Sequence, residues 1–146
     1  MTRDKTISKI IEIKEFNKEQ IEAEVKKAQA RLNLEQAKLD ELERDYKKTC
    51  ADLLAKQMKG TMPVTEIDLF QSYVKHLGKL IEKQGAVVRV HKADVEAKQQ
   101  AMIVAYQEQR LFEKLHDKIV SEQIKETDHI EQKEADFSFL NRKAER

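Results

Sequence analysis

Apolar residues recur every seven positions along the second half of this chain, beginning at Ile67. One column of this repeat holds Ile67, Val74, Ile81, Val88, Val95 and Met102. The column three residues further on holds Phe70, Leu77, Gln84, His91, Lys98, Ala105, Phe112 and Ile119. Two such columns are typical of the a and d positions of a coiled coil, because a 3.5-residue period keeps one stripe facing a partner helix. Thr65 is expected to cap the start of this helix, with Asp68 completing a capping box.

The first half of the chain also has a helical pattern and supplies the partner. Its seam holds Ile21, Val25, Ala28, Leu32, Leu39, Leu42, Tyr46 and Leu53. Lys14 and Lys18 fall where the register asks for apolar residues. The same end is rich in large apolar side chains, namely Ile7, Ile10, Ile11, Ile13 and Phe16. Two interpretations are open: a shift of register within the coil, or a surface that contacts another protein.

A single break separates the two helical patterns, between Lys59 and Glu66. Gly60 suits the position just after a helix C-terminus, and Pro63 delays the start of the next helix. A connection this short makes the helices antiparallel neighbours. We therefore predict an all-α fold, one elongated coiled-coil hairpin over residues 1–146, with helices at about 6–59 and 66–142 and a turn at about 60–65.

The second predicted helix is longer than the first. At 1.5 Å per residue it would extend past its partner by roughly 30 Å. This overhang, residues 121–146, keeps a sparse apolar stripe of Ile124, Ile130, Phe137 and Leu140. Apolar residues without an intramolecular partner predict a partner elsewhere.

A second apolar stripe lies beside the main seam of the long helix. It holds Leu69, Tyr73, Leu80, Val87 and Val90. The stripe is interpreted either as a broad core face or as an exposed surface for docking another protein. Gly78 and Gly85, seven residues apart, leave a similar choice between a tolerant surface and close approach by another backbone.

The composition fits long helices better than a packed globule. The chain is 38% charged and 5% aromatic, with one proline and three glycines. A net charge of +1 argues against nucleic-acid binding. Cys50 is the only cysteine, so no internal disulfide is possible. No stretch approaches the roughly 18 apolar residues of a membrane span, and a cytoplasmic location is expected.

The sequence offers little for catalysis. The four histidines are never three or four residues apart, and neither a zinc-binding motif nor a phosphate-binding glycine loop occurs. We predict no enzyme activity, no cofactor and no metal. His91 and His116 fall on seam positions, where polar residues fix register. A hairpin folded symmetrically about residues 60–65 would bring Glu35 near His91, and we predict that this pair locks the register.

Two segments resemble the flagellar export protein FliJ family. The stretch from Phe70 to Gln84 reads FQSYVKHLGKLIEKQ and is similar to a family pattern of an aromatic residue, Leu, an apolar–Ile pair and Gln or His. The tail from Glu131 to Asp136 reads EQKEAD and resembles the family's acidic–Gln–Lys–x–x–Asp motif. The layout of two helices, the second longer, is also similar over nearly the whole chain.

The resemblance implies a non-enzymatic, stalk-like component of the flagellar type III export apparatus. Such a protein would insert into the hexameric ring of the export ATPase FliI and contact the export gate FlhA. It would also bind the regulator FliH and chaperones of late substrates, and meet the inner membrane only through these partners. The implied gate contact is Tyr73, Leu77, Leu80 and Gln84. The implied ring contact is Ile7, Ile10, Ile11, Gln132, Lys133 and Asp136.

Three other functions fit the same pattern. The homologous stalk of a virulence injectisome has a similar layout and task. A generic coiled-coil adaptor would have no ATPase partner, and it would be favoured if the stripe from Leu69 to Val90 were buried. A prefoldin-like holdase is also a helical hairpin, although the break at 59–66 is too short for the strands through which prefoldins oligomerise.

Overall fold

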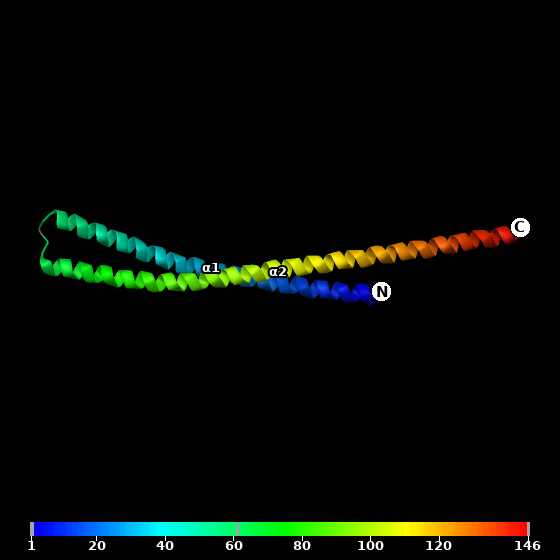
Figure 1. Ribbon diagram of the computed structural model, residues 1–146, viewed down its shortest axis with the longest axis horizontal. Helices are drawn as coiled ribbons and strands as arrows, with labels where there is room; N and C mark the ends of the chain where they lie inside the picture. The colour runs from blue at the N-terminus through cyan, green and yellow to red at the C-terminus, as the bar shows by residue number, and fades with distance from the viewer. Residues whose placement is uncertain (1, 61, 146) are drawn as a thin grey trace. The chain divides into compact units, whose positions relative to one another are not determined.

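The structure is a computed structural model that describes residues 2–60 and 62–145. Helix α1 covers Thr2–Met58 and helix α2 covers Val64–Ala144 (Figure 1). The two helices pack against each other, and the described residues contain no strand. The predicted all-α hairpin with a longer second helix is therefore confirmed.

Contacts between the helices fall into two units, which we describe separately. The loop unit is Ile21–Ala101 and contains the connection between the helices. The terminal unit combines the residues up to Gln20 with those from Met102 onward.

The helix end in the loop unit is built around Gly60. Its backbone φ is 70°, and its N–H donates to the carbonyl of Gln57 at 3.1 Å. A side chain at this φ would be strained, so glycine is the residue that ends α1 most readily. The sequence prediction for Gly60 is confirmed.

The predicted cap at Thr65 is wrong. The carbonyl of Pro63 accepts hydrogen bonds from the N–H groups of Glu66 and Ile67, both at 3.1 Å, and α2 begins at Val64. Proline blocks the helix only on its N-terminal side, since its own carbonyl is free to accept the first helical bond. Thr65 therefore lies inside the first turn.

The core of the loop unit is a thin line of side chains between the helices. Ala28, Leu77, Val88 and Val95 are buried, and the remaining predicted seam positions of α2 in this unit are half-buried. Two helices alone enclose few large side chains, because most seam residues are covered mainly from one direction. The predicted seam in this unit is thus confirmed except at Tyr46 of α1, which is exposed.

The seam of the terminal unit contains polar residues among apolar ones. Gln109 is buried at a seam position, and His116 is half-buried. Beyond about residue 120, α2 continues past the point where α1 begins, so its last turns have no α1 residue opposite (Figure 1).

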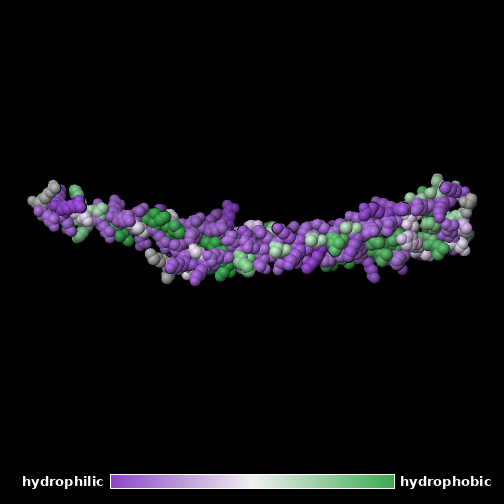
Figure 2. Space-filling view, turned by 180° about the vertical axis from the view of Figure 1, so that it is seen from behind, coloured by the Kyte–Doolittle hydropathy of each residue, from purple (hydrophilic) through white to green (hydrophobic). Residues whose placement is uncertain are grey.

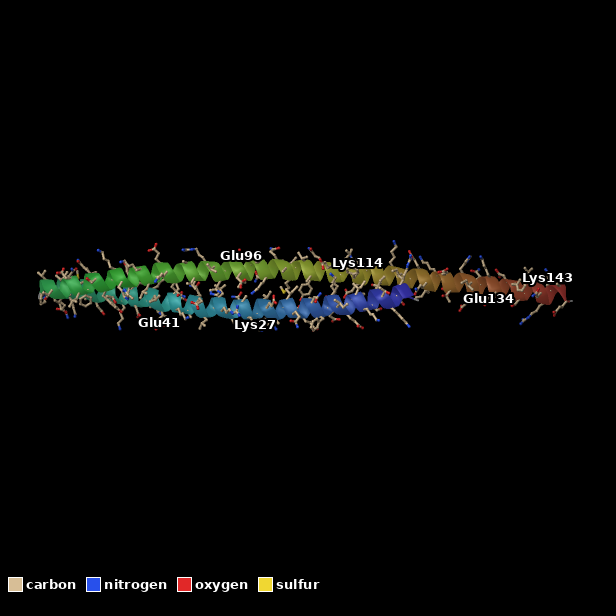
Figure 3. All side chains as sticks on the ribbon, turned by 90° about the horizontal axis from the view of Figure 1, so that it is seen from below. Lys27, Glu41, Glu96, Lys114, Glu134 and Lys143 are labelled. Carbon is tan, nitrogen blue, oxygen red and sulfur yellow. The ribbon has the colours of Figure 1, made fainter. Side chains whose placement is uncertain are left out.

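Charged side chains occupy the outward faces of both helices. The labelled Lys27 and Glu41 on α1, and Glu96 and Lys114 on α2, project away from the partner helix (Figure 3). None of the described helical segments is both long enough and apolar enough to cross a membrane.

Candidate functional site

The four residues implied as the gate contact lie on one stretch of α2 but face two directions. Tyr73 is 49% exposed and Leu80 is half-buried on the outer side of the helix. Leu77 is only 3% exposed because it packs in the core of the loop unit. Gln84 is half-buried and points toward α1. The structure thus leaves Tyr73 and Leu80 accessible, while Leu77 and Gln84 hold the hairpin together.

Gln84 forms the most extensive polar contact in the seam of the loop unit. Its Nε2 donates to Glu35 Oε2 at 2.6 Å and to the Glu35 backbone carbonyl at 2.9 Å. Lys38 Nζ donates to the other carboxylate oxygen at 3.2 Å. The bond from Gln84, followed by the bond from Lys38, lowers the pKa of the Glu35 carboxyl, because both stabilise its charged form.

The predicted hydrogen-bonded pair of Glu35 and His91 is not formed. Gln84, one heptad earlier on α2, bonds the carboxylate instead, and His91 only adds a smaller charge effect on the Glu35 pKa. The reason is the position of the turn. Helices that end at Met58 and restart at Val64 fold back about residue 61, nearer to the N-terminus than the predicted turn. This shift moves the residue opposite Glu35 toward Gln84.

The second stripe of the long helix lies at the surface. Leu69 and Val90 are 71% and 68% exposed, Tyr73 and Val87 are also exposed, and Leu80 is half-buried. On the face that Figure 2 shows, hydrophobic residues gather near the connection between the helices. Of the two interpretations of this stripe, the exposed surface is the one that the structure supports.

The isoleucines implied as part of the ring contact lie in the terminal unit, partly covered by α2. Ile7, Ile10 and Ile11 are half-buried, whereas Ile13 and Phe16 are exposed. The covered residues belong to the seam, so the accessible apolar surface of this segment is on the other side of α1.

Lys14 and Lys18 keep their seam positions rather than forcing a shift of register. Lys14 Nζ pairs with Glu108 Oε2 at 2.8 Å and lies 5.7 Å from the centre of the Phe112 ring. Lys18 Nζ lies 5.0 Å from the centre of the Tyr106 ring. Long aliphatic stems cover apolar surface while the ammonium groups meet aromatic faces and a carboxylate. Sequence reasoning missed these partners, although aromatic residues at the matching α2 positions were a usable signal.

A polar cluster joins the start of α1 to α2. His116 Nε2 lies 2.9 Å from Asp4 Oδ1 and 3.3 Å from Ser8 Oγ. Asp4 Oδ1 is buried and accepts no hydrogen bond from the described residues, so His116 meets it in a close polar contact without hydrogen-bond geometry.

The remaining implied ring-contact residues lie on the unpaired end of α2. Gln132, Lys133 and Asp136 are exposed, and their spacing places them on one side of the helix. Ile124, Ile130, Phe137, Phe139 and Leu140 expose half or more of their surface in the same segment. These residues lie about 25 Å along α2 from the part that faces Ile7, so the structure does not join the two groups into one patch.

The described residues include no cluster of three histidine, cysteine or acidic side chains that would hold a metal ion. The surface depressions are shallow and open. One of them lies along α2 in the loop unit and is lined by His76, Lys79, Leu80, Glu82, Lys83, Ala86 and Arg89. Basic residues thus border part of the exposed stripe.

The family described as "Flagellar FliJ protein" matches residues 4–139. No curated protein and no solved structure matches this chain significantly.

Proposed function

Because this chain belongs to the flagellar FliJ protein family, a family of non-catalytic export components, we propose that it is a stalk in the flagellar type III export apparatus. The unpaired end of α2 inserts into the ring of the export ATPase FliI, and the exposed stripe near the connection contacts the export gate FlhA. The regulator FliH and chaperones of late substrates are further partners, through which the protein meets the inner membrane.

The observation that carries this proposal is the segment of α2 from residue 121 to residue 144. It is helical and carries exposed apolar side chains, although α1 offers it nothing to pack against. Burying a Phe or Leu side chain contributes roughly 1.5–3 kcal/mol, so Phe137 and Leu140 make this segment a source of binding energy. An encircling partner would cover a helix exposed on every side.

The gate contact rests on Tyr73 and Leu80. Tyr73 is a large, rigid side chain whose ring is half-exposed, which is typical of residues that dominate binding energy at interfaces. Leu77 and Gln84 support this contact indirectly. Leu77 packs in the core and Gln84 bonds Glu35, so both hold α2 against α1.

The proposed mechanism involves no chemistry by this chain. A helical hairpin that contacts successive ring states with different affinity shifts their populations, and by linkage the ring states shift the position of the hairpin. ATP turnover at the ring would thereby be coupled to the gate.

ATP hydrolysis by the export ATPase tests the ring contact. Full-length protein is expected to stimulate steady-state turnover, and a chain ending at Val120 is expected to lose that stimulation. Phe137→Asp should abolish most of it, because the charge would be buried in the ring. Leu111→Asp is the matched control, because Leu111 is as exposed as Phe137, at 66%, but precedes the inserted segment, and this variant should remain active. Stimulation by the shortened chain equal to that of the full chain would rule out the ring contact.

Binding to the soluble domain of the export gate tests the second contact. Tyr73→Ala should weaken binding by about tenfold or more, the loss expected of a central interface residue. Lys75→Ala, which lies on the other side of the same helical turn, should bind normally. Equal binding by both variants would remove the stripe from the gate contact. Full-length protein that neither stimulates the ATPase nor binds the gate would indicate an adaptor with other partners.

A further inference from the structure

The exposed stripe on α2 extends further than the first apolar residues suggest. In the loop unit it continues as a series of residues whose spacing alternates strictly between four and three positions. We call this series the outer seam, and it consists of His76, Leu80, Lys83, Val87, Val90, Asp94, Ala97 and Ala101. Leu80 and Asp94 are half-buried, and the other six residues are exposed. The alanines at the end of the series hide it from a search for large apolar residues.

A four–three alternation is the signature of a second coiled-coil contact. Such a period keeps one stripe of a helix facing another helix over several turns, whereas an irregular patch would suit a globular surface. α1 occupies the inner seam of α2, which contains the buried Leu77, Val88 and Val95. Within the described residues no helix covers the outer seam. Its regular spacing indicates that a further helix is the occupant.

The outer seam is complementary to itself when two copies run antiparallel. Pairing Val87 with Val90 of the other copy places Leu80 opposite Ala97 and His76 opposite Ala101. Leu80 and His76 then each meet an alanine and the two valines meet each other, which suits close packing of helices. The same register places Lys83 opposite Asp94, so the two charged residues of the seam meet with opposite sign. Lys83 makes no ion pair within the described chain, whereas Asp94 has one with Lys98 at 3.1 Å.

Neighbouring registers lose this match. Sliding one helix along the other by one heptad, in either direction, places Lys83 opposite Val87 or opposite Ala101. A parallel pairing in register places Lys83 opposite itself. Burying an unpaired charge, or two like charges, is costly, so the antiparallel register centred between Val87 and Val90 is the favoured one. Ala86 and Ala93, beside the seam, allow the helices to approach closely at that centre.

We propose that a second copy of this chain packs antiparallel on the outer seam, with Lys83 of each copy paired to Asp94 of the other. The contact covers residues 76–101, a helix about 39 Å long, which places it among small, reversible interfaces. It goes beyond the proposed export function, and it would cover Leu80. Self-association and gate binding would therefore compete for the same face of α2.

Sedimentation equilibrium of the full chain, from micromolar to millimolar concentration, tests the self-association. We expect a monomer–dimer equilibrium in which Lys83→Asp weakens dimerisation by at least about tenfold. Asp94→Lys should do the same, and the double exchange K83D/D94K should restore most of the affinity. Lys75→Asp is the matched control, because it makes the same charge change off the seam. A chain that stays monomeric throughout, or a dimer that ignores Lys83→Asp, would overturn the proposal.

Disulfide trapping tests the direction of pairing. In a Cys50→Ser background, a mixture of His76→Cys and Ala101→Cys chains should crosslink to each other. Neither chain alone should crosslink, since an antiparallel pairing separates identical positions by about 25 residues, or nearly 40 Å. Crosslinking of His76→Cys with itself would show a parallel pairing and contradict the proposal. Helical circular dichroism of each variant shows whether it folds.

Discussion

The carboxylate of Glu35 shows how single residues set the register of the hairpin. Gln84 bonds both its side chain and its backbone carbonyl, so a shift along the seam would break two hydrogen bonds at once. A carboxylate this well supplied with donors has a lowered pKa, since each donor favours the charged form. Register and protonation at this position are therefore linked.

A pH dependence follows from that link. A lowered pKa in the folded state means that Glu35 stabilises the fold above its unfolded pKa, about 4.5, and that this contribution disappears as the pH falls through the lower folded value. We expect Glu35→Gln to melt at a lower temperature than the natural chain at neutral pH, and the difference to shrink in acid. Thermal melts followed by circular dichroism between pH 7 and pH 3 measure it.

Glu41→Gln is the control for this experiment, because Glu41 is an exposed carboxylate of the same helix that projects away from α2. If the melting temperatures of the Glu35→Gln chain and the natural chain differed by the same amount at every pH from 7 to 3, the linkage would be refuted.

At the scale of the helix, Gly60 has a different role from Gly78 and Gly85. Gly60 ends α1 with a positive φ that other residues adopt at a cost. Gly78 and Gly85 lie inside α2, where a side chain would meet nothing at the first and only the tip of Arg89 at 3.8 Å at the second. Within the described chain neither glycine admits a close backbone, so of the two interpretations the tolerant surface is favoured.

Alanine at each glycine should separate these roles. Gly78→Ala and Gly85→Ala are each expected to raise the free energy of unfolding by about 1 kcal/mol, because alanine is the better helix former. Gly60→Ala should lower it by about 1–2 kcal/mol through strain in the left-handed conformation. Urea unfolding with an unchanged slope measures all three. Destabilisation by Gly78→Ala would point to a contact that occupies the helix surface at that position.

At the scale of the whole chain, the contacts that hold the hairpin end before the chain does. The polar cluster of Asp4, Ser8 and His116 lies close to the start of α1. Ile119 and Val120, just beyond it on α2, are half-buried, and the large apolar residues from Ile124 onward are exposed. Stability and partner binding are therefore assigned to different parts of α2.

Shortening the chain tests this separation. A protein ending at Val120 should keep a melting temperature within a few degrees of the full chain, since the removed segment packs against nothing in the described structure. His116→Ala should lower the melting temperature instead, because it removes a half-buried side chain together with its hydrogen bond to Ser8 and its close contact with Asp4, a loss of about 1 kcal/mol. A large drop in melting temperature on truncation, measured by circular dichroism, would show that the segment contributes to the fold.

The sequence by itself determined the two helices, the break at Gly60, the seam positions and the longer second helix. These depend on periodicity and on backbone preferences, which are local properties of the chain. The tertiary structure decided which residues of α1 and α2 lie opposite each other. The partner of Glu35, the accommodation of Lys14 and Lys18 and the exposure of Tyr73 all depend on where the chain folds back. A change of about 1.5 residues in that centre moves the position opposite a given residue by about three residues, nearly a full helical turn, which no single-helix pattern can reveal.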